Sequence, residues 1–320
     1  PKTSFAPYMY PFVKAKCFAA SGGHTCQKIG HSCLRKVVSF VHVPWRRAWR
    51  LGGRAVQILI SSTGPGFSVW KLKQVVPIFR QKFGMLRWGP DPQECICCNG
   101  PKWYTTLLVA DAAQMYEQVD SRLVLDAFDA KAALLLQLQE KDTITVRRQF
   151  PVRGWPGGSI HTRSRNFIVF SVAQLRRMLQ ASCMLRFASI GNLVVKARGL
   201  VIGGLLSMIS AVCLLSFEEE QFLQGGWTRV WQVPPQWEIH ELFFGLRYVD
   251  DLLLVSGSLC HQCLRTGLCS MFSVHFDINL EEAEQTWTDL VFSVDPMTRG
   301  VSWTAKNPNR LWVQGKGDKK

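Results

Sequence analysis

Acidic side chains are almost missing from the first hundred residues of this 320-residue chain. Asp91 and Glu94 are the acids there, against fifteen lysines and arginines, so this third carries thirteen of the chain's net fifteen positive charges. A basic segment interleaved with tryptophans suits a phosphate backbone with stacked bases. A solvated basic face, or a surface that touches anionic lipid, has the same composition. We expect nucleic acid to bind at four arginines: Arg46, Arg47, Arg50 and Arg54.

The signatures of several common protein classes are also missing. The sequence has no G-x-G-x-x-G or P-loop pattern, which argues against the usual nucleotide-binding α/β folds, and no clear internal repeat. No basic-then-apolar leader follows Pro1, so we expect an intracellular protein, nuclear or cytoplasmic, that is a fragment of a longer reading frame. Apolar residues make up 47% of the chain, which is enough for a sizeable core.

The eleven cysteines do not form the even, paired framework of a secreted protein, so we expect reduced thiols. Three clusters stand out in the sequence, the first of which also contains histidines: Cys17, His24, Cys26, His31 and Cys33; Cys95, Cys97 and Cys98; and Cys260 with Cys263. We interpret the last group as an isolated C-x-x-C pair. The first two groups do not show the doubled C-x-x-C spacing of a firm zinc site, so zinc is not expected.

One long run, at 199–217, carries no charge over nineteen residues (GLVIGGLLSMISAVCLLSF). That length meets the minimum for a membrane span. Two serines and a cluster of glycines interrupt the run, and a loop followed by a fully buried helix has the same composition. The segment by itself leaves both interpretations open.

Hydrophobic periodicity predicts an α+β mixture of short strands and helices, without a regular βαβ alternation. The expected helices span 34–60, in two pieces broken near Pro44, then 112–140, and then 171–185 behind an S-x-x-Q capping box. The expected strands span 103–110, 143–150 and 192–197, with two more after residue 286. Prolines and glycines in 89–101 mark a boundary. We therefore predict a basic, mostly helical region at 1–100, a main domain at 101–285 and terminal strands at 286–320.

Two adjacent aspartates, Asp250 and Asp251, interrupt an apolar run in RYVDDLLLVS. Asp is a poor strand former, and the apolar runs on either side have similar lengths. This pattern predicts a β-hairpin with the aspartates at or beside its turn. A plain surface hairpin gives the same pattern, because Asp is a normal turn residue.

A third carboxylate, Asp111, ends the apolar strand WYTTLLVA and begins a helix. It is either an ordinary helix N-cap or a residue at the lip of a sheet. If its strand pairs with the hairpin, Asp111 and Asp250 meet at one edge, where carboxylates repel unless a cation neutralises them. Mg²⁺ prefers carboxylate oxygens, and two such ions promote phosphoryl transfer.

This set of residues resembles the palm of a reverse transcriptase. Motif A of that family is an aspartate after a strand with an aromatic residue five positions later, here Asp111 and Tyr116 in ADAAQMYE. Motif C is Y-x-D-D in a hairpin, here YVDD from Tyr248 to Asp251. Arg247 precedes it, as in several retroelement and telomerase-type enzymes.

Motif B of the family is a glycine-rich loop that leads into a buried helix, and GLVIGGLLS places Gly199, Gly203 and Ser207 in register with it. This assigns the uncharged run to a loop and a core helix, so no membrane partner is expected. After motif C, TWTDLVFSVD resembles the motif E hairpin. The proline usual in motif B is Val201, the motif D lysine has no clear counterpart, and no thumb follows the last strands.

The resemblance implies a right-hand polymerase palm, an antiparallel sheet with helices packed on one face, and an insertion between motifs A and B. It implies RNA-directed DNA polymerase activity of a retrotransposon-like element, with an RNA template, a DNA or RNA primer and deoxynucleotides as partners. Asp111, Asp250 and Asp251 would hold two Mg²⁺ ions, or Mn²⁺, with Asp250 indispensable. Tyr116 would select deoxyribose. Gly199, Gly203 and Ser207 would contact the template and the nucleotide. Arg247 and Tyr248 would support the hairpin.

Two other interpretations stay open. An inactive or truncated retroelement relic would bind nucleic acid without copying it, which the altered motif B and the missing thumb favour. A protein with a single membrane span at 199–217 is the other.

Overall fold

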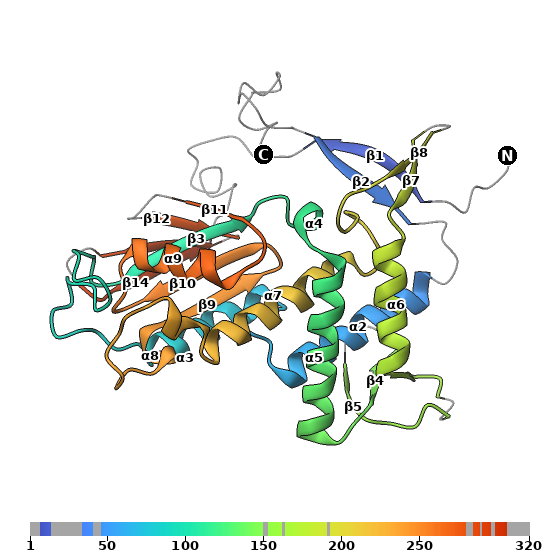
Figure 1. Cartoon of the computed structure of the whole chain (residues 1–320), viewed down its shortest axis with the longest axis horizontal. Helices are drawn as coiled ribbons and strands as arrows, with labels where there is room; N and C mark the ends of the chain where they lie inside the picture. Colours follow the sequence, from blue (N-terminus) through green and yellow to red (C-terminus); the bar gives the residue numbers. More distant parts are fainter. Residues whose placement is uncertain are drawn as a thin grey trace, which may run out of the picture. The chain divides into compact units, whose positions relative to one another are not determined.

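A computed structural model describes residues 7–13, 34–40, 46–149, 153–161, 164–190, 193–279, 284–288, 290–295 and 298–305. The chain forms two compact units, each built from two separate stretches of sequence (Figure 1). The first unit comprises Pro1–Gly64 and Gln114–Phe217, and the second comprises Pro65–Ala113 and Glu218–Lys320. The cysteine and histidine group between Cys17 and Cys33 lies outside the described residues.

The first unit contains two small sheets and a group of helices. One sheet has the order β2-β1-β7-β8, with strands β1 (Tyr8–Val13), β2 (Leu34–Ser39), β7 (Phe187–Ile190) and β8 (Leu193–Lys196). The other has the order β5-β4-β6, with strands β4 (Thr143–Arg147), β5 (Gly154–Pro156) and β6 (Phe167–Ser171). The helices are α2 (Arg46–Thr63), α4 (Met115–Gln118), α5 (Ser121–Gln139) and α6 (Val172–Met184). Helices α2, α5 and α6 pack against one another.

Helix α6 begins where its sequence predicts, whereas the helix predicted at 112–140 is divided into α4 and α5. The capping box before α6 is confirmed: the Gln174 backbone N–H donates to Ser171 Oγ at 3.1 Å, and the Ser171 N–H donates to Gln174 Oε1 at 2.9 Å. The Asp120 carboxylate caps α5 by accepting from the Arg122 N–H at 2.8 Å. These bonds satisfy backbone donors that a helix N-terminus leaves without partners.

Of the two helical pieces predicted at 34–60, the second is confirmed as α2, but the first is wrong. Residues 34–39 form strand β2, which pairs antiparallel with β1 along its whole length. The segment LRKVVS contains adjacent valines, which fit a strand, and its register depends on a partner more than twenty residues earlier. Pairing with β1 therefore overrides the basic-and-apolar pattern that indicated a helix.

The second unit is built around the antiparallel sheet β11-β3-β10-β9. Its strands are β3 (Thr106–Ala112), β9 (Phe243–Tyr248), β10 (Asp251–Ser256) and β11 (Phe276–Ile278). A second antiparallel sheet, β12-β13-β14, comprises β12 (Glu284–Trp287), β13 (Leu290–Val294) and β14 (Val301–Ala305). The helices are η1 (Leu72–Gln74), α3 (Val75–Phe83), η2 (Gly226–Arg229), α8 (Ile239–Leu242) and α9 (His261–Met271).

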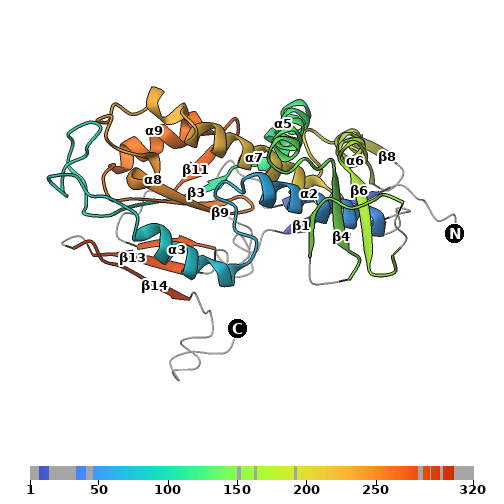
Figure 2. The same ribbon diagram turned by 90° about the horizontal axis from the view of Figure 1, so that it is seen from below.

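Both faces of the central sheet are covered (Figure 2): α9 lies on one face, and α3 with β13 and β14 lies on the other. Leu107 and Val109 of β3 point to the same face as Leu253 and Val255 of β10, since side chains alternate along a strand. They form a core with aromatic side chains from α3, β12 and β13: Phe79, Trp287 and Phe292. The predicted strand at 103–110 and the predicted hairpin are confirmed as β3 and β9–β10.

The uncharged run at 199–217 is a loop followed by a helix. The loop precedes α7 (Ser207–Leu223), whose sequence ends in the acidic stretch FEEEQFL. Within the part of the chain that the structure describes, no helix is long and apolar enough to cross a membrane. The composition of this run is explained by burial, because Ile209, Val212 and Leu215 are almost wholly inaccessible.

Candidate active site

The three aspartates of the sequence motifs come together at one end of the second unit's central sheet. Strands β9 and β10 are joined by a two-residue turn, Val249–Asp250, and Tyr248 pairs with Asp251. Strand β3 runs antiparallel to β10, with Asp111 directly opposite Asp251. The Ala112 backbone N–H also donates to the Asp250 carbonyl at 3.1 Å. Two stretches of sequence nearly 140 residues apart therefore place Asp111 and Asp251 directly opposite each other on adjacent strands.

A fourth carboxylate extends this row. Asp277 of β11 pairs directly with Asp111 on the other side of β3. Directly opposite residues project from the same face of an antiparallel sheet, so Asp251, Asp111 and Asp277 line three adjacent strands. Sequence reasoning missed Asp277, because FDI matches no motif and only the register of β11 reveals it. The His275 imidazole lies 3.5 Å from the Asp277 carboxylate, and both side chains are exposed.

A row of like charges on one sheet face is destabilising unless a cation offsets it. Asp111 is exposed, and Asp250 and Asp251 are half-buried, so solvent reaches this end of the sheet. Among the described residues, the aspartates do not form a group in which three ligand atoms lie within 4.8 Å of one another; four cysteines elsewhere do. Exposed carboxylate oxygens are the donors that Mg²⁺ and Mn²⁺ prefer over thiolate sites.

The turn that carries Asp250 is strained. Val249 has a φ of 60°, in the left-handed region that a β-branched residue rarely adopts. The Arg247 guanidinium holds this turn by donating from Nη1 to the Val249 carbonyl at 2.9 Å. Backbone strain of this kind costs about 1–3 kcal/mol and persists only where surrounding contacts impose it.

Arg247 is itself fixed by a buried ion pair. Its side chain and that of Glu219 on α7 are both inaccessible, and Arg247 Nε donates to Glu219 Oε1 at 2.5 Å. Arg247 Nη2 donates to Ser68 Oγ at 2.8 Å, and Glu219 Oε2 accepts from the Phe67 N–H at 2.7 Å. The hairpin, α7 and the segment at 67–69 therefore share one hydrogen-bonded network.

The neighbouring acid on α7 has a different environment. Burial raises the pKa of the Glu218 carboxyl, although its Oε1 accepts from the Ser273 N–H at 3.2 Å. Glu218 is half-buried, and its loss of hydration disfavours the charged form more than the Ser273 hydrogen bonds and the Arg247 charge favour it. Glu218 thus contrasts with Glu219, whose charge Arg247 balances at 2.5 Å.

The residues of motif B and the motif A aromatic lie in the first unit. The Leu200 N–H donates to the Tyr116 carbonyl at 2.6 Å, and Gly199, at a φ of 57°, would place a Cβ atom 2.2 Å from that oxygen. Gly203, at a φ of 88°, lies against β2, where a Cβ atom would be 2.4 Å from the Val38 carbonyl oxygen. The loop is thus attached to α4 at one end and to β2 at the other, before Ser207 begins α7. Only glycine fits both positions.

The four arginines expected to bind nucleic acid share one stripe of α2. At 3.6 residues per turn, Arg46, Arg47, Arg50 and Arg54 fall on the side opposite the helix's buried residues. The buried residues are Leu51, Gly52, Ala55, Val56, Leu59, Ile60 and Thr63. Arg47 and Arg50 are exposed, and α2 contains no acidic residue. This face is therefore a basic surface within the first unit.

Comparison with known proteins identifies a fold. No protein-family model and no curated protein matches the sequence. The structure of apo telomerase from Candida tropicalis matches 94% of this chain with a TM-score of 0.57 and 12% identity. The telomerase of Candida albicans, bound to a TWJ fragment of telomeric RNA, matches 95% with a TM-score of 0.56 and 13% identity. The chain shares its fold with the aligned part of these telomerase chains and spans about half of their length, 49% and 47%.

Replacing Glu219 should expose the dependence of the second unit on its buried ion pair. In Glu219→Gln, Arg247 keeps its charge in an inaccessible position without a carboxylate, so we expect the free energy of unfolding to fall by about 3 kcal/mol or more. Urea denaturation of the full chain at pH 7 measures this. The matched control is Glu218→Gln. Its raised pKa means that ionisation at pH 7 opposes folding, so this variant should be as stable as the parent or more so. Equal losses in the two variants would contradict the role of the pair.

Replacing Gly203 should disturb the loop before α7. In Gly203→Ala, both the positive φ and the Val38 carbonyl oppose the new methyl group, so we expect a loss of more than about 1 kcal/mol in unfolding free energy. Gly84→Ala is the matched control, because Gly84 has a φ of −66° and ordinary space for a Cβ atom. That change should be neutral or slightly stabilising. A Gly203 variant as stable as the Gly84 variant would show that the loop does not need glycine there.

Proposed function

We propose that this chain is the RNA-directed DNA polymerase domain of a retrotransposon-like element. The observation that carries the proposal is the pairing of β3 with β10, which places Asp111 opposite Asp251 and beside the turn of Asp250. These are the motif A and motif C aspartates of the reverse transcriptase palm that the sequence resembles. The polymerase-like fold shared with telomerase structures supports the same conclusion.

The donor set of this site fits the proposed metal. Asp111, Asp250 and Asp251 offer carboxylate oxygens in partly exposed positions, which suits Mg²⁺ or Mn²⁺. We assign the binding of two such ions to these residues. When bound, the ions neutralise charge on the reacting phosphate and lower the pKa of the attacking hydroxyl.

In the proposed reaction, the primer 3′-oxygen forms a bond to the α-phosphorus of a deoxynucleotide, the bond from that phosphorus to pyrophosphate breaks, and the hydroxyl proton passes to solvent water. Asp250 lies in the turn between β9 and β10, and Arg247 donates a hydrogen bond to the Val249 carbonyl of that turn. The position of Asp250 therefore depends on the buried ion pair of Arg247 with Glu219. Asp251 begins β10, where pairing on both sides fixes its backbone.

We assign supporting roles to residues of the first unit. Tyr116 would select deoxyribose, and its attachment to the loop of Gly199 would hold the aromatic ring beside the segment that contacts template and nucleotide. Gly203 and Ser207 belong to that segment. The arginine face of α2 would bind the phosphate backbone of template or primer.

Loss of the Asp250 carboxylate should abolish polymerisation. In primer extension on an RNA template with Mg²⁺ and deoxynucleotides, Asp250→Asn should lower incorporation by at least about a thousandfold, because one donated carboxylate is lost from the site. Asp126→Asn is the matched control, since Asp126 is an exposed residue of α5. Unchanged incorporation by the Asp250 variant would end the metal assignment.

Removal of the Tyr116 ring should relax the choice of sugar. We expect Tyr116→Ala to incorporate ribonucleotides several-fold more readily relative to deoxynucleotides, because the ring no longer fills the space of a 2′-hydroxyl. Tyr116→Phe keeps the ring and should keep the preference. The ratio of kcat/KM for the two nucleotide types measures the effect, and an unchanged ratio in Tyr116→Ala would refute the assignment.

A non-catalytic nucleic-acid-binding protein is the second candidate, and the arginine face of α2 favours it. Such a protein would bind RNA with an affinity that falls steeply with salt. Binding of this kind without incorporation, in a longer polypeptide as well as in this chain, distinguishes it from the polymerase.

A further inference from the structure

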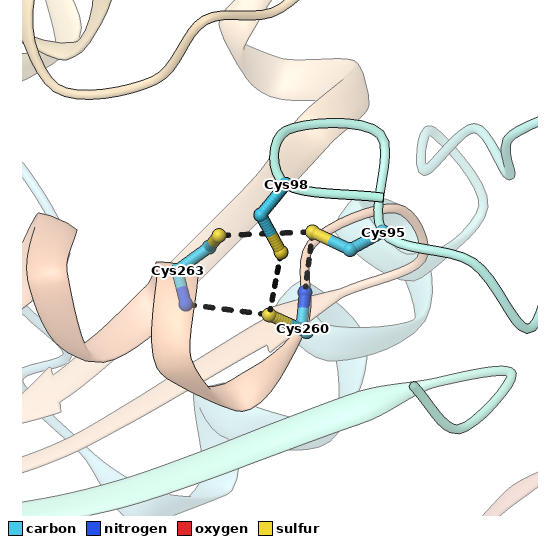
Figure 3. Close-up of side chains that lie close together, drawn as sticks. All are labelled: Cys95, Cys98, Cys260 and Cys263. Carbon is cyan, nitrogen blue, oxygen red and sulfur yellow. Dashed lines mark hydrogen bonds between the residues drawn. The ribbon is translucent and has the colours of Figure 1, made fainter. Parts of the chain in front are cut away.

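Four cysteines from two distant segments converge within the second unit (Figure 3). Cys95 and Cys98 lie between α3 and β3, while Cys260 and Cys263 lie at the start of α9. Their side chains point toward one another, and their four sulfur atoms all lie within 4.8 Å of each other. Cys95 and Cys98 have C-x-x-C spacing, as do Cys260 and Cys263, so the two segments together form the doubled C-x-x-C pattern that neither shows alone.

We infer that these four cysteines bind one zinc ion in a closed, structural site. The Sγ atoms of Cys95 and Cys263 are 3.7 Å apart, and those of Cys98 and Cys260 are also 3.7 Å apart. A tetrahedral zinc ion with Zn–S bonds of about 2.3 Å needs sulfur atoms about 3.8 Å apart. Two of the six edges of the required tetrahedron therefore already have the right length, and the other four are no longer than 4.8 Å.

Backbone hydrogen bonds fix the conformation of each segment that carries a pair of cysteines. In the first segment, the Cys95 N–H donates to the Gly100 carbonyl at 2.8 Å, and the Asn99 N–H donates to the Cys95 carbonyl at 2.8 Å. Asn99 turns the chain with a φ of 54°. In the second segment, Cys260 is the N-cap of α9, and its sulfur accepts from the Cys263 N–H at 3.5 Å. A helix N-terminus favours the thiolate form that metal binding requires.

Further donors and a cation offset the negative charge of such a site. The Cys260 N–H donates to Cys95 Sγ at 3.2 Å, so one segment solvates the sulfur of the other. Lys102 is buried nearby, where its ammonium donates to the carbonyls of Pro92 and Trp103. Four thiolates around Zn²⁺ carry two net negative charges, and donors of this kind stabilise them.

A disulfide fits the geometry of the four cysteines less well than zinc does, and Mg²⁺ fits the chemistry of their sulfur atoms less well. A disulfide needs sulfur atoms about 2.05 Å apart, whereas Cys95 and Cys263, and likewise Cys98 and Cys260, are 3.7 Å apart and all four are free cysteines. Mg²⁺ prefers oxygen, so the thiolates and the aspartates select different metals. Iron also accepts a tetrahedron of sulfurs, and metal analysis separates it from zinc.

The position of the site indicates what the ion would do. β3 begins at Thr106, which pairs with Ser256, the last residue of β10, so the cysteines flank one end of this strand pair. Asp111 and Asp251 stand at the other end, about 17 Å away at 3.3 Å per residue. The ion would join the segment before β3 to the segment after β10, and so clamp the two strands that carry the aspartates. This inference does not rest on the proposed polymerase activity.

The test is the metal content of the full chain and of matched cysteine variants. The chain, expressed with zinc and purified without chelator, should contain about one equivalent of zinc by mass spectrometry of the metal. Cys98→Ser and Cys263→Ser should each lose that equivalent. Cys97→Ser should keep it, because Cys97 lies between the ligands but outside the group. The strong chelator phenanthroline should lower the melting temperature of the parent and of Cys97→Ser.

A second measurement covers the case in which the ligand variants do not fold. The parent protein loaded with Co²⁺ should show the visible absorption of a tetrahedral thiolate complex, and titration with Zn²⁺ should remove it. Parent protein without zinc, with iron in its place, or with a mapped disulfide between any two of the four cysteines would overturn the inference. So would zinc retained in both Cys98→Ser and Cys263→Ser, since the ion would then lie elsewhere in the chain.

Discussion

The arrangement of the second unit depends on one buried ion pair. Arg247 and Glu219 are both inaccessible to solvent, and removal of two charges from water costs more than their attraction returns unless hydrogen bonds satisfy the remaining atoms. Here they do: the guanidinium also bonds to Ser68 and Val249, and the carboxylate also bonds to the backbone of Phe67. The pair thus joins the end of α7, the segment at 67–69 and the turn between β9 and β10. The strained φ of Val249 is held by this network, and Asp250 is the next residue.

Electrostatic repulsion among the aspartates destabilises one end of the central sheet, and packing of the rest of the sheet offsets it. Strand alternation and register place Asp251, Asp111 and Asp277 on neighbouring strands, where their charges repel. The strands stay paired because their other residues, among them Leu107, Val109, Leu253 and Val255, are buried in the core. Burial of these apolar side chains offsets the electrostatic cost of the aspartate row. The same concentration of negative charge favours the binding of cations at that end of the sheet.

Hard and soft donors lie at opposite ends of the same strand pair. The carboxylates are partly exposed and suit exchangeable, oxygen-bound ions, whereas three of the four cysteines are buried and suit a permanent ion. This separation is consistent with a catalytic role for the aspartates and a structural role for the cysteines. In the proposed reaction the aspartates would need access to solvent and substrate, whereas the proposed zinc ion would only hold two segments together.

Local patterns in the sequence determined the elements whose signals are short-range. The capping box of Ser171 and Gln174, the apolar strand before Asp111 and the hairpin around Asp250 depend on neighbouring residues, and all three could be predicted. Only the tertiary structure decided that 34–39 is a strand, that Asp277 stands beside Asp111, and that Cys95 and Cys98 meet Cys260 and Cys263. It also revealed Glu219 as the partner of Arg247. In each of these cases the partner is distant in the sequence, and the contact is set by strand register and burial, which local propensity does not encode.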